Sequence, residues 1–210
     1  MPVFNNALAG AAGQSGGDAG FKIERSLRFN GSNDNAHLTR TFLSSGNRKT
    51  WTASWWMKLG DTSGNRGLFG NPGNSNSAPQ FFSYINGNGQ IEAYEYDLVN
   101  GSHHYHFIKK TQAYFRDPNA WYHCVFQYDS TQSSSEEGFK IYVNGERITS
   151  WAVNNLLGYA QNYQSAWNST KNSGVHKIGL CDWYFDGLLA EFHFIDGQAL
   201  TATDFGEFDD

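Results

Sequence analysis

Several features that mark particular classes of protein are scarce or missing in this chain of 210 residues. No apolar run approaches the roughly 20 residues that a membrane-spanning helix needs. Charged residues make up only 17% of the chain, and the net charge of −5 argues against non-specific binding of nucleic acid, which requires a basic surface. The first residues lack the basic and apolar segments of a secretory signal, so we expect synthesis in a cytoplasm.

Cysteine is also rare, since Cys124 and Cys181 are the only two. A single core of this length can be stable without a disulfide, because it buries about 70% of the surface of the unfolded chain. Both cysteines fall within apolar strand patterns. We therefore expect two reduced, buried thiols, and a disulfide only if their strands are neighbours.

What the chain does have is glycine and aromatic residues, with 23 glycines and an aromatic fraction of 16%. Glycine supplies turns and aromatic side chains fill pleated surfaces, so this composition favours an all-β fold. Apolar and alternating segments predict strands at residues 26–30, 36–40, 51–58, 68–70, 80–85, 90–96, 103–109, 121–129, 139–143, 146–148, 175–180 and 185–197. No amphipathic helix is evident, and the pattern predicts a sandwich of two antiparallel sheets.

The division of the chain follows from its composition. Residues 24–202 form the predicted domain, and residues 203–210 form a short C-terminal tail. Residues 1–23 are rich in small and polar residues and bury too little to fold alone, so we expect an extended arm that becomes ordered against a partner, with a flexible terminus as the alternative. Its candidate anchoring residues are Phe4, Asn5, Asn6 and Leu8.

The predicted final strand, residues 185–197, shows the clearest alternation in the sequence. Asp186-Gly187 is interpreted as the turn that precedes it, and Asp196-Gly197 closes it. Strict alternation places Leu188, Ala190, Phe192 and Phe194 on one face. We expect this face to be buried.

Four motifs occur in an order that is typical of one family. They are residues 121–123 (WYH), 139–145 (FKIYVNG), 178–179 (IG) and 185–187 (FDG) followed by Glu191. In this order they resemble the laminin-G-like or concanavalin-A-like jelly roll over about residues 26–200, which implies a jelly-roll form of the sandwich. Many members have an Asp before the Glu of the last strand. Ala190 stands there in this chain, which counts against a metal or polar role that depends on that carboxylate.

A narrower resemblance involves residues 1–12 (MPVFNNALAGAA), 115–118 (FRDP) and 194–200 (FIDGQAL). These segments are similar to virion proteins of marine tailed bacteriophages, especially cyanophages. The resemblance implies a structural component of the particle, such as a tail fibre, a capsid fibre or a decoration protein. Residues 203–208 (TDFGEF) also match those proteins, in which more chain commonly follows, so we expect a processed or truncated product.

Glycanases share the jelly roll, and their chemistry depends on paired carboxylates. Glycoside hydrolysis needs two carboxyl groups within roughly 5–10 Å of each other. Glu95 and Asp97 share a strand face by parity, whereas Glu92 points away, and the order found in glycanases is not reproduced. Solvated strand charges are therefore the favoured interpretation, and no catalytic residue is predicted.

The densest group of metal-ligand residue types is at residues 103–106 (HHYH). His104 and His106 lie on one strand face and could share a metal ion, particularly if three chains met on a trimer axis. Surface histidines on a polar strand are the commoner outcome. We keep the pair as a weak candidate and predict no cofactor.

Exposed aromatic residues are the stronger functional clue. Trp56 points outward from the predicted strand at residues 51–58. The other three, Tyr159, Tyr163 and Trp167, lie in the predicted loop that follows residue 157. Aromatic rings anchor protein interfaces and also stack on sugar rings. Protein contact is favoured for a subunit of an assembled particle, and sugar stacking is the alternative.

The leading hypothesis from sequence is a non-enzymatic structural protein located in the virion. Its arm would attach it to other virion proteins of the tail or capsid, and we expect a homo-oligomer, with a trimer as one form. The alternative is a carbohydrate-binding adhesin that recognises host surface glycans, and a glycanase is a more distant alternative. Neither nucleic-acid binding nor membrane insertion is expected.

Overall fold

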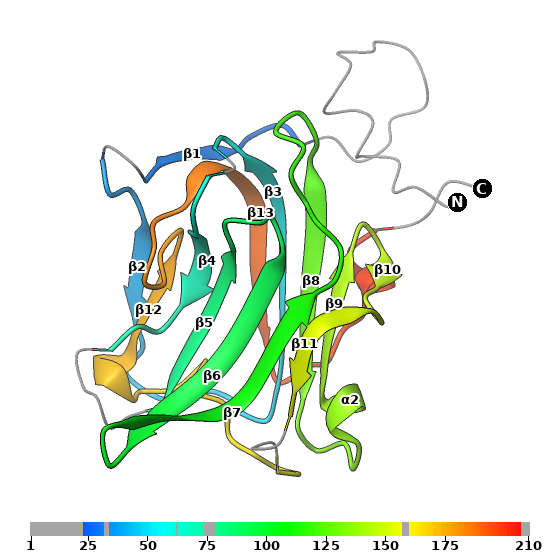
Figure 1. Cartoon of the computed structure of the whole chain (residues 1–210). Coiled ribbons are helices and arrows are strands. Elements are labelled where there is room, and N and C mark those ends of the chain that lie inside the picture. Colours follow the sequence, from blue (N-terminus) through cyan, green and yellow to red (C-terminus); the bar gives the residue numbers. More distant parts are fainter. Residues whose placement is uncertain (1–22, 32–33, 62, 74–78, 157–159, 207–210) are drawn as a thin grey trace.

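The computed structural model describes residues 23–31, 34–61, 63–73, 79–156 and 160–206, and Figure 1 shows them as two packed layers of strands. The predicted anchoring residues of the arm, Phe4, Asn5, Asn6 and Leu8, lie outside these ranges. No helix within them is long and apolar enough to cross a membrane.

Thirteen strands of the described chain form two antiparallel sheets. The six-stranded sheet has the order β1 (Leu27–Asn30), β13 (Asp186–Asp196), β3 (Thr50–Leu59), β8 (Tyr122–Asp129), β9 (Phe139–Val143) and β10 (Glu146–Arg147). The seven-stranded sheet has the order β11 (Trp151–Asn155), β7 (Ser102–Thr111), β6 (Ile91–Val99), β5 (Gln80–Ile85), β4 (Arg66–Gly70), β12 (Val175–Ile178) and β2 (Leu38–Thr41). The predicted all-β jelly-roll sandwich is confirmed.

The sequence patterns located every one of these strands except β11. This edge strand alternates between half-buried and exposed positions, so its pattern is weak. The patterns also missed the short helix α2 (Ser135–Gly138) and the 3-10 turns η1 (Asn172–Gly174) and η2 (Ala202–Asp204). The turn between β9 and β10 follows the prediction, because Asn144 and Gly145 have φ values of 48° and 81°, as a type I′ turn requires.

The core between the sheets consists mainly of aromatic rings. Trp51 of β3 stacks on Tyr128 of β8 with ring centroids 5.1 Å apart, and Trp55 meets Phe126 edge to face at 4.9 Å. These side chains are fully buried, and the seven-stranded sheet contributes Phe69, Phe81 and Phe107. Burying each such ring stabilises the fold by about 1.5–3 kcal/mol relative to an exposed ring.

This core needs no covalent crosslink, and the prediction of two reduced thiols is confirmed. Cys124 lies in β8, whereas Cys181 follows β12, and both are free and buried. Burial raises the pKa of the Cys181 thiol to about 12, which makes it a poor nucleophile.

The start of β13 differs from the prediction. Asp186 and Gly187 are not a turn before the strand, because they lie within it and pair with Asn30 and Phe29 of β1. Gly187 has a φ of 146° and lies so close to the carbonyl of Lys58 that a Cβ would collide with it. The Asp-Gly sequence at this point therefore permits close strand packing and does not form a hairpin.

The middle of β13 contains a β-bulge. Its register with β3 shifts between Ala190 and His193, and Glu191 adopts a left-handed φ of 47°. Leu189 therefore packs in the core together with Phe192 and Phe194. The predicted shared face is wrong for Leu188 and Ala190, which belong to a separate cluster on the outer side, because the bulge adds one residue to the alternation.

The outer face of the six-stranded sheet is covered by the segment that follows β13. Thr52 Oγ1 donates a hydrogen bond to the carbonyl of Gln198 at 2.7 Å and accepts one from the amide of Leu200 at 2.8 Å. Ala202 then packs on Val125, and both are buried. The predicted boundary at residue 202 falls at the start of η2, so the described part of the predicted tail continues this cover.

Candidate functional site

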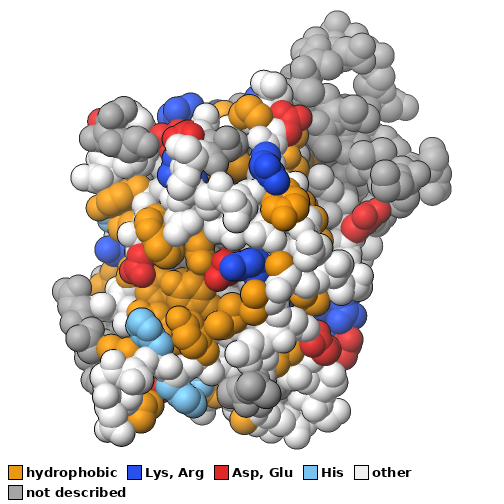
Figure 2. Space-filling model, in the orientation of Figure 1, with side chains coloured by type: hydrophobic (Ala, Val, Ile, Leu, Met, Phe, Trp, Pro, Cys, Tyr) orange, Lys and Arg blue, Asp and Glu red, His pale blue; other side chains and the backbone are white. Residues whose placement is uncertain are grey.

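The outer face of the seven-stranded sheet carries a group of aromatic side chains over its middle strands (Figure 2). We call this group the aromatic platform. It consists of Phe82 and Tyr84 of β5, Tyr94 and Tyr96 of β6, Tyr105 of β7, and Trp183 from the loop between β12 and β13. Side chains alternate along a strand, so the platform residues of β5 and β6 project away from the core that their neighbours Phe81 and Ala93 fill.

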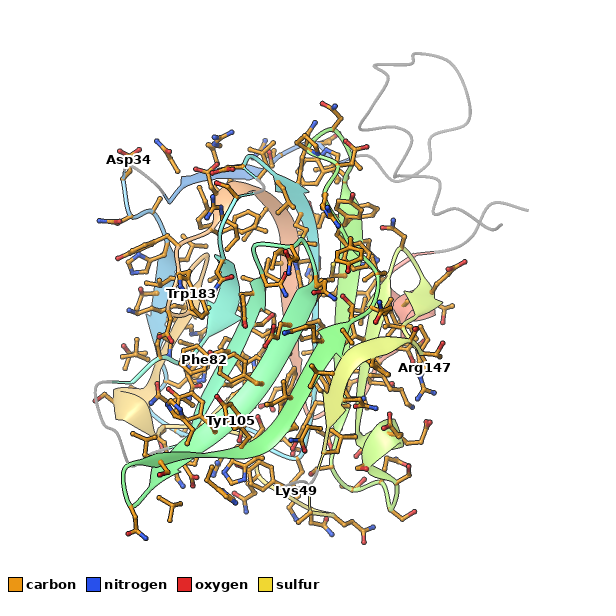
Figure 3. All side chains as sticks on the ribbon, in the orientation of Figure 1. Asp34, Lys49, Phe82, Tyr105, Arg147 and Trp183 are labelled. Carbon is orange, nitrogen blue, oxygen red and sulfur yellow. The ribbon has the colours of Figure 1, made fainter. Side chains whose placement is uncertain are left out.

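The platform rings are packed against one another in layers. Phe82 is fully buried and stacks on Tyr94 at 5.1 Å and on Tyr96 at 5.6 Å between ring centroids. Tyr105 lies 5.8 Å from Tyr96 and is 39% exposed. Phe82 and Tyr84, which is 7% exposed, therefore form the floor of the platform, and Tyr94, Tyr96 and Tyr105 are partly exposed around them. Figure 3 shows Phe82, Tyr105 and Trp183 over this face of the sheet.

The loop that carries Trp183 is held against the sheet by close backbone packing. A Cβ at Gly67 of β4 would collide with the carbonyl oxygen of Trp183, so this approach requires glycine. The amide of Cys181 donates to that same oxygen at 3.2 Å. These contacts bring the Trp183 ring to 4.8 Å from the ring of Tyr84.

Polar groups lie beside the platform. Lys110 Nζ is 3.0 Å from Glu92 Oε2, and the Tyr84 hydroxyl also hydrogen-bonds to Glu92. Burial, followed by the charge of Glu92, raises the pKa of Tyr84 well above its usual range, so the phenol stays neutral. Burial also raises the pKa of Asp182. The rim of the platform therefore offers both donors and acceptors.

The two glutamates of β6 lie on opposite faces of the sheet, as parity predicted. Glu95 is fully buried on the inner side, where Tyr163 Oη donates to Oε1 at 2.6 Å and Ser165 Oγ donates to Oε2 at 2.8 Å. Burial raises the pKa of Glu95 to about 7, although these donors act in the opposite direction. Glu92 and Glu95 therefore do not form a pair across one site.

Asp97 shares the inner side with Glu95, and the two predicted histidines lie next to it. His104 Nδ1 is 3.2 Å from Asp97 Oδ1, and His106 Nε2 is 3.4 Å from Asp97 Oδ2. A β-bulge between β6 and β7 lets His106 face inward together with Phe107. The structure thus brings His104 and His106 together and adds a carboxylate from the neighbouring strand.

Two of the aromatic residues predicted to be exposed are buried. Trp56 is 4% exposed, because it packs with Trp121 and Ala190 on the covered face of the six-stranded sheet. Trp167 is 3% exposed and contacts Phe69 and His176 at 5.0 and 4.6 Å between ring centroids. The expectation of exposure was wrong for both, because Trp121 and Ala190 pack on Trp56, and the loop that carries Trp167 inserts this ring into the core between the sheets.

The loop around Trp167 is fixed to the sandwich by hydrogen bonds. Asn71 Nδ2 donates to the carbonyl of Ala166 at 2.9 Å, and the amide of Asn168 donates to His176 Nε2 at 3.0 Å. Tyr163 is half-buried, and its hydroxyl is held by the carboxylate of Glu95. Tyr159 lies outside the described residues.

Reasoning from the sequence missed the aromatic platform. The signal was present in β6, where Tyr94 and Tyr96 alternate with Ala93 and Glu95. Both faces of β5 and β6 carry large side chains, so alternation alone does not reveal which face is the core. When a strand carries aromatic residues on both faces, one face fills the core and the other is a candidate binding surface.

Several proteins of known structure share this fold. Among solved structures, domain 4 of AbnA, a GH43 extracellular arabinanase from Geobacillus stearothermophilus, shares 17% identity, with a TM-score of 0.58 and coverage of 99% of this chain and 87% of that one. The heptameric SAP-like pentraxin from Limulus polyphemus shares 18%, with a TM-score of 0.52 and coverage of 84% and 77%. Domains LG4-5 of the mouse laminin alpha1 chain share 12%, with a TM-score of 0.52 and coverage of 87% and 44%.

At these identities the likeness shows the fold alone. No curated protein sequence matches the chain. Residues 30–204 match the family described as the Concanavalin A-like lectin/glucanases superfamily. This match runs from the end of β1 to η2, which is most of the chain, and the chain therefore belongs to that superfamily.

Proposed function

We propose that this chain is a carbohydrate-binding protein and that the aromatic platform is its binding surface. The observation that carries the proposal is the uncovered group of rings on the outer face of the seven-stranded sheet (Figure 2). Contiguous apolar surface of this kind marks binding sites in soluble proteins. Aromatic rings suit sugars because they offer flat apolar faces, and the polar rim can bond to hydroxyl groups.

The comparisons support a glycan as the ligand class. The AbnA domain, which shares the fold, was solved in complex with arabinotriose. A glycan ligand also agrees with the charges at the rim, where Glu92 is paired with Lys110 and the face carries no single strong charge. We therefore propose neutral or weakly charged oligosaccharides as the ligand class.

We propose binding without hydrolysis. Glycoside hydrolysis needs two carboxyl groups that flank the bond to be cleaved, roughly 5–10 Å apart and both open to the substrate. The two glutamates of β6 lie on opposite sides of the sheet, and Glu92, on the platform side, is paired with Lys110 Nζ at 3.0 Å, which supports a binding role. Incubation with each bound glycan followed by an assay of reducing ends tests this point, and release of new reducing ends would favour a glycanase.

A glycan array that includes bacterial lipopolysaccharides and polysaccharides tests the proposal directly. Tyr105→Ala and Trp183→Ala should each weaken binding of any hit by about 10-fold or more, which corresponds to about 1.4 kcal/mol of lost stacking. Tyr114→Ala is the matched control, because Tyr114 is 51% exposed and lies in the connection between β7 and β8. Equal losses in all three variants, or an array without hits, would overturn the proposal.

The second proposal is a structural role in a phage particle. It is supported by the resemblance of residues 1–12 and 194–200 to virion proteins. A carbohydrate-binding domain on such a particle would act as an adhesin, so the two proposals are compatible. Deletion of residues 1–20 should prevent incorporation into particles while the domain stays folded, and normal incorporation would refute the role of the arm. Light scattering of the purified chain tests the expected homo-oligomer.

A further inference from the structure

The cluster of Asp97, His104 and His106 has the composition of a metal site. All three candidate ligand atoms, one from each residue, lie within 4.8 Å of one another. Two imidazole nitrogens and one carboxylate oxygen suit late first-row divalent cations such as Zn²⁺, whereas Ca²⁺ and Mg²⁺ prefer sites made of oxygen. The cluster lies on the inner side of the sheet and is separate from the aromatic platform.

The distances fit a small tetrahedral ion. Bonds of about 2.0–2.1 Å to a zinc ion place neighbouring ligand atoms about 3.3 Å apart. His104 Nδ1 lies 3.2 Å from Oδ1 of Asp97, and His106 Nε2 lies 3.4 Å from Oδ2, so each nitrogen is near this spacing from one carboxylate oxygen. A small turn of the Asp97 carboxylate brings a single oxygen close to both nitrogens. The nitrogens of the two histidines must move closer together, and His104 can turn because its side chain is 56% exposed.

His106 provides a second, independent observation. Its Nε2 atom is buried and makes no hydrogen bond of good geometry within the described part of the chain. Buried polar atoms normally have a partner, so this atom calls for an explanation. It is the same nitrogen that points toward Asp97. A bound cation would satisfy it.

The ring of His106 is also fixed in place by its neighbours. It stacks on the ring of Tyr163 with centroids 4.6 Å apart, and the hydroxyl of Tyr163 is held in turn by Glu95. Metal sites depend on such supporting contacts, which orient the ligands before the ion arrives. The more exposed His104 leaves one side of the cluster open to solvent, as an entry path requires.

We propose that Asp97, His104 and His106 form a binding site for one late first-row divalent cation, with Zn²⁺ as the reference ion. The site lies within a single chain, so it does not require the trimer axis considered from sequence. It ties the ends of β6 and β7 together beneath the loop that contains Tyr163. Coordination by three residues leaves a fourth position open to water or another ligand.

The test uses the full chain without a polyhistidine tag, treated with a chelator and then titrated with ZnCl₂ by calorimetry. One ion should bind per chain, and Co²⁺ in its place should give the intense visible absorption of a tetrahedral ion. His104→Ala and His106→Ala should each weaken binding by at least about 100-fold, because loss of a supporting residue alone costs 10–100-fold. His103→Ala is the matched control, since His103 lies on the same strand but contacts the platform residue Tyr96.

Three results would overturn the proposal. One is the absence of saturable binding up to about 100 µM Zn²⁺. Another is unchanged binding by His106→Ala, and the third is an equal loss in His103→Ala. If an alanine variant does not fold in the presence of chelator, Asp97→Asn is tested instead, because it preserves the shape of the side chain and removes its charge. Wild-type affinity for Zn²⁺ in that variant would also refute the site.

Discussion

The outer faces of the two sheets differ in what covers them. The six-stranded sheet presents polar side chains such as Thr52 and Gln127, and the segment after β13 lies over them and accepts their hydrogen bonds. The seven-stranded sheet presents the aromatic platform, with Tyr105 still 39% exposed. The outer face of the six-stranded sheet is covered by another segment of the chain, whereas that of the seven-stranded sheet leaves apolar surface exposed to a ligand.

The comparison also shows that aromatic content does not identify the functional face. Trp56 and Tyr105 both project from an outer face, yet only Tyr105 is exposed. The exposure of the two rings differs because Trp121 and Ala190 pack on Trp56. Substitutions on the covered face should therefore act on stability, whereas substitutions on the platform should act on binding.

The largest expected effect is that of Trp56→Ala on the covered face. Removal of a buried tryptophan leaves a cavity and costs about 3–5 kcal/mol of unfolding free energy. Urea denaturation of the variant and of the wild-type protein measures this loss. The folded fraction should bind any glycan ligand as the wild-type protein does. A stability loss below about 1 kcal/mol would mean that the face is not covered in solution.

This face is also where prediction from sequence failed. The fold class followed from alternation and turn residues, as in β3 and at Asn144-Gly145. Alternation also predicted correctly that Trp56 projects away from Trp55, but a period of two does not show whether an outward side chain meets solvent or another segment. Trp121 and Ala190, which pack on Trp56, come from distant parts of the sequence, and the pattern of β3 alone does not indicate these contacts.

The cluster of Asp97, His104 and His106 shows a second limit of prediction from sequence. His104 and His106 are two residues apart, so their common face was predictable from sequence. The contribution of Asp97 was not, because it depends on the register between β6 and β7, and that register shifts at a bulge. Likewise the platform required Trp183, which the packing of a loop on Gly67 brings to the sheet.

A second prediction concerns acid and the covered face. Burial lowers the pKa of His123, which lies beside Trp56 on the neighbouring strand, from its ordinary 6.5 to about 4. Between these values the unfolded chain binds a proton that the folded chain does not, so stability falls as the pH decreases from about 6.5 to 4. From pH 7 to pH 5 this group alone should cost about 2 kcal/mol.

The measurement compares wild-type protein with His123→Gln in urea at pH 8, 7 and 5. The difference at pH 8 gives the cost of the substitution itself, and the variant should lose about 2 kcal/mol less than the wild-type protein between pH 7 and pH 5. Glu95 and His176 also have shifted pKa values, but they are present in both proteins and cancel. Parallel pH dependences would show that His123 is accessible to solvent.

The platform should respond much less in the same assay. Tyr105→Ala removes a ring that is already 39% exposed, so we expect a loss of about 1 kcal/mol or less in urea denaturation. The same variant should show the large loss of glycan affinity described above. A stability loss as large as that of Trp56→Ala would remove the distinction between the two faces.

The smallest expected effect concerns the bulge in β13, which decides which residues reach each face. Glu191 adopts a left-handed φ of 47°, a conformation that costs a non-glycine residue about 1–2 kcal/mol. Glycine removes this strain but loses about 0.5–1 kcal/mol through chain entropy, so Glu191→Gly should stabilise the protein by about 0.5 kcal/mol. Glu191→Ala also removes the contact with His193 at 3.5 Å but keeps the strain, so it should give no gain. If glycine were no better than alanine, the bulge would not hold this conformation in solution, and the outward placement of Leu188 and Ala190 would need another cause.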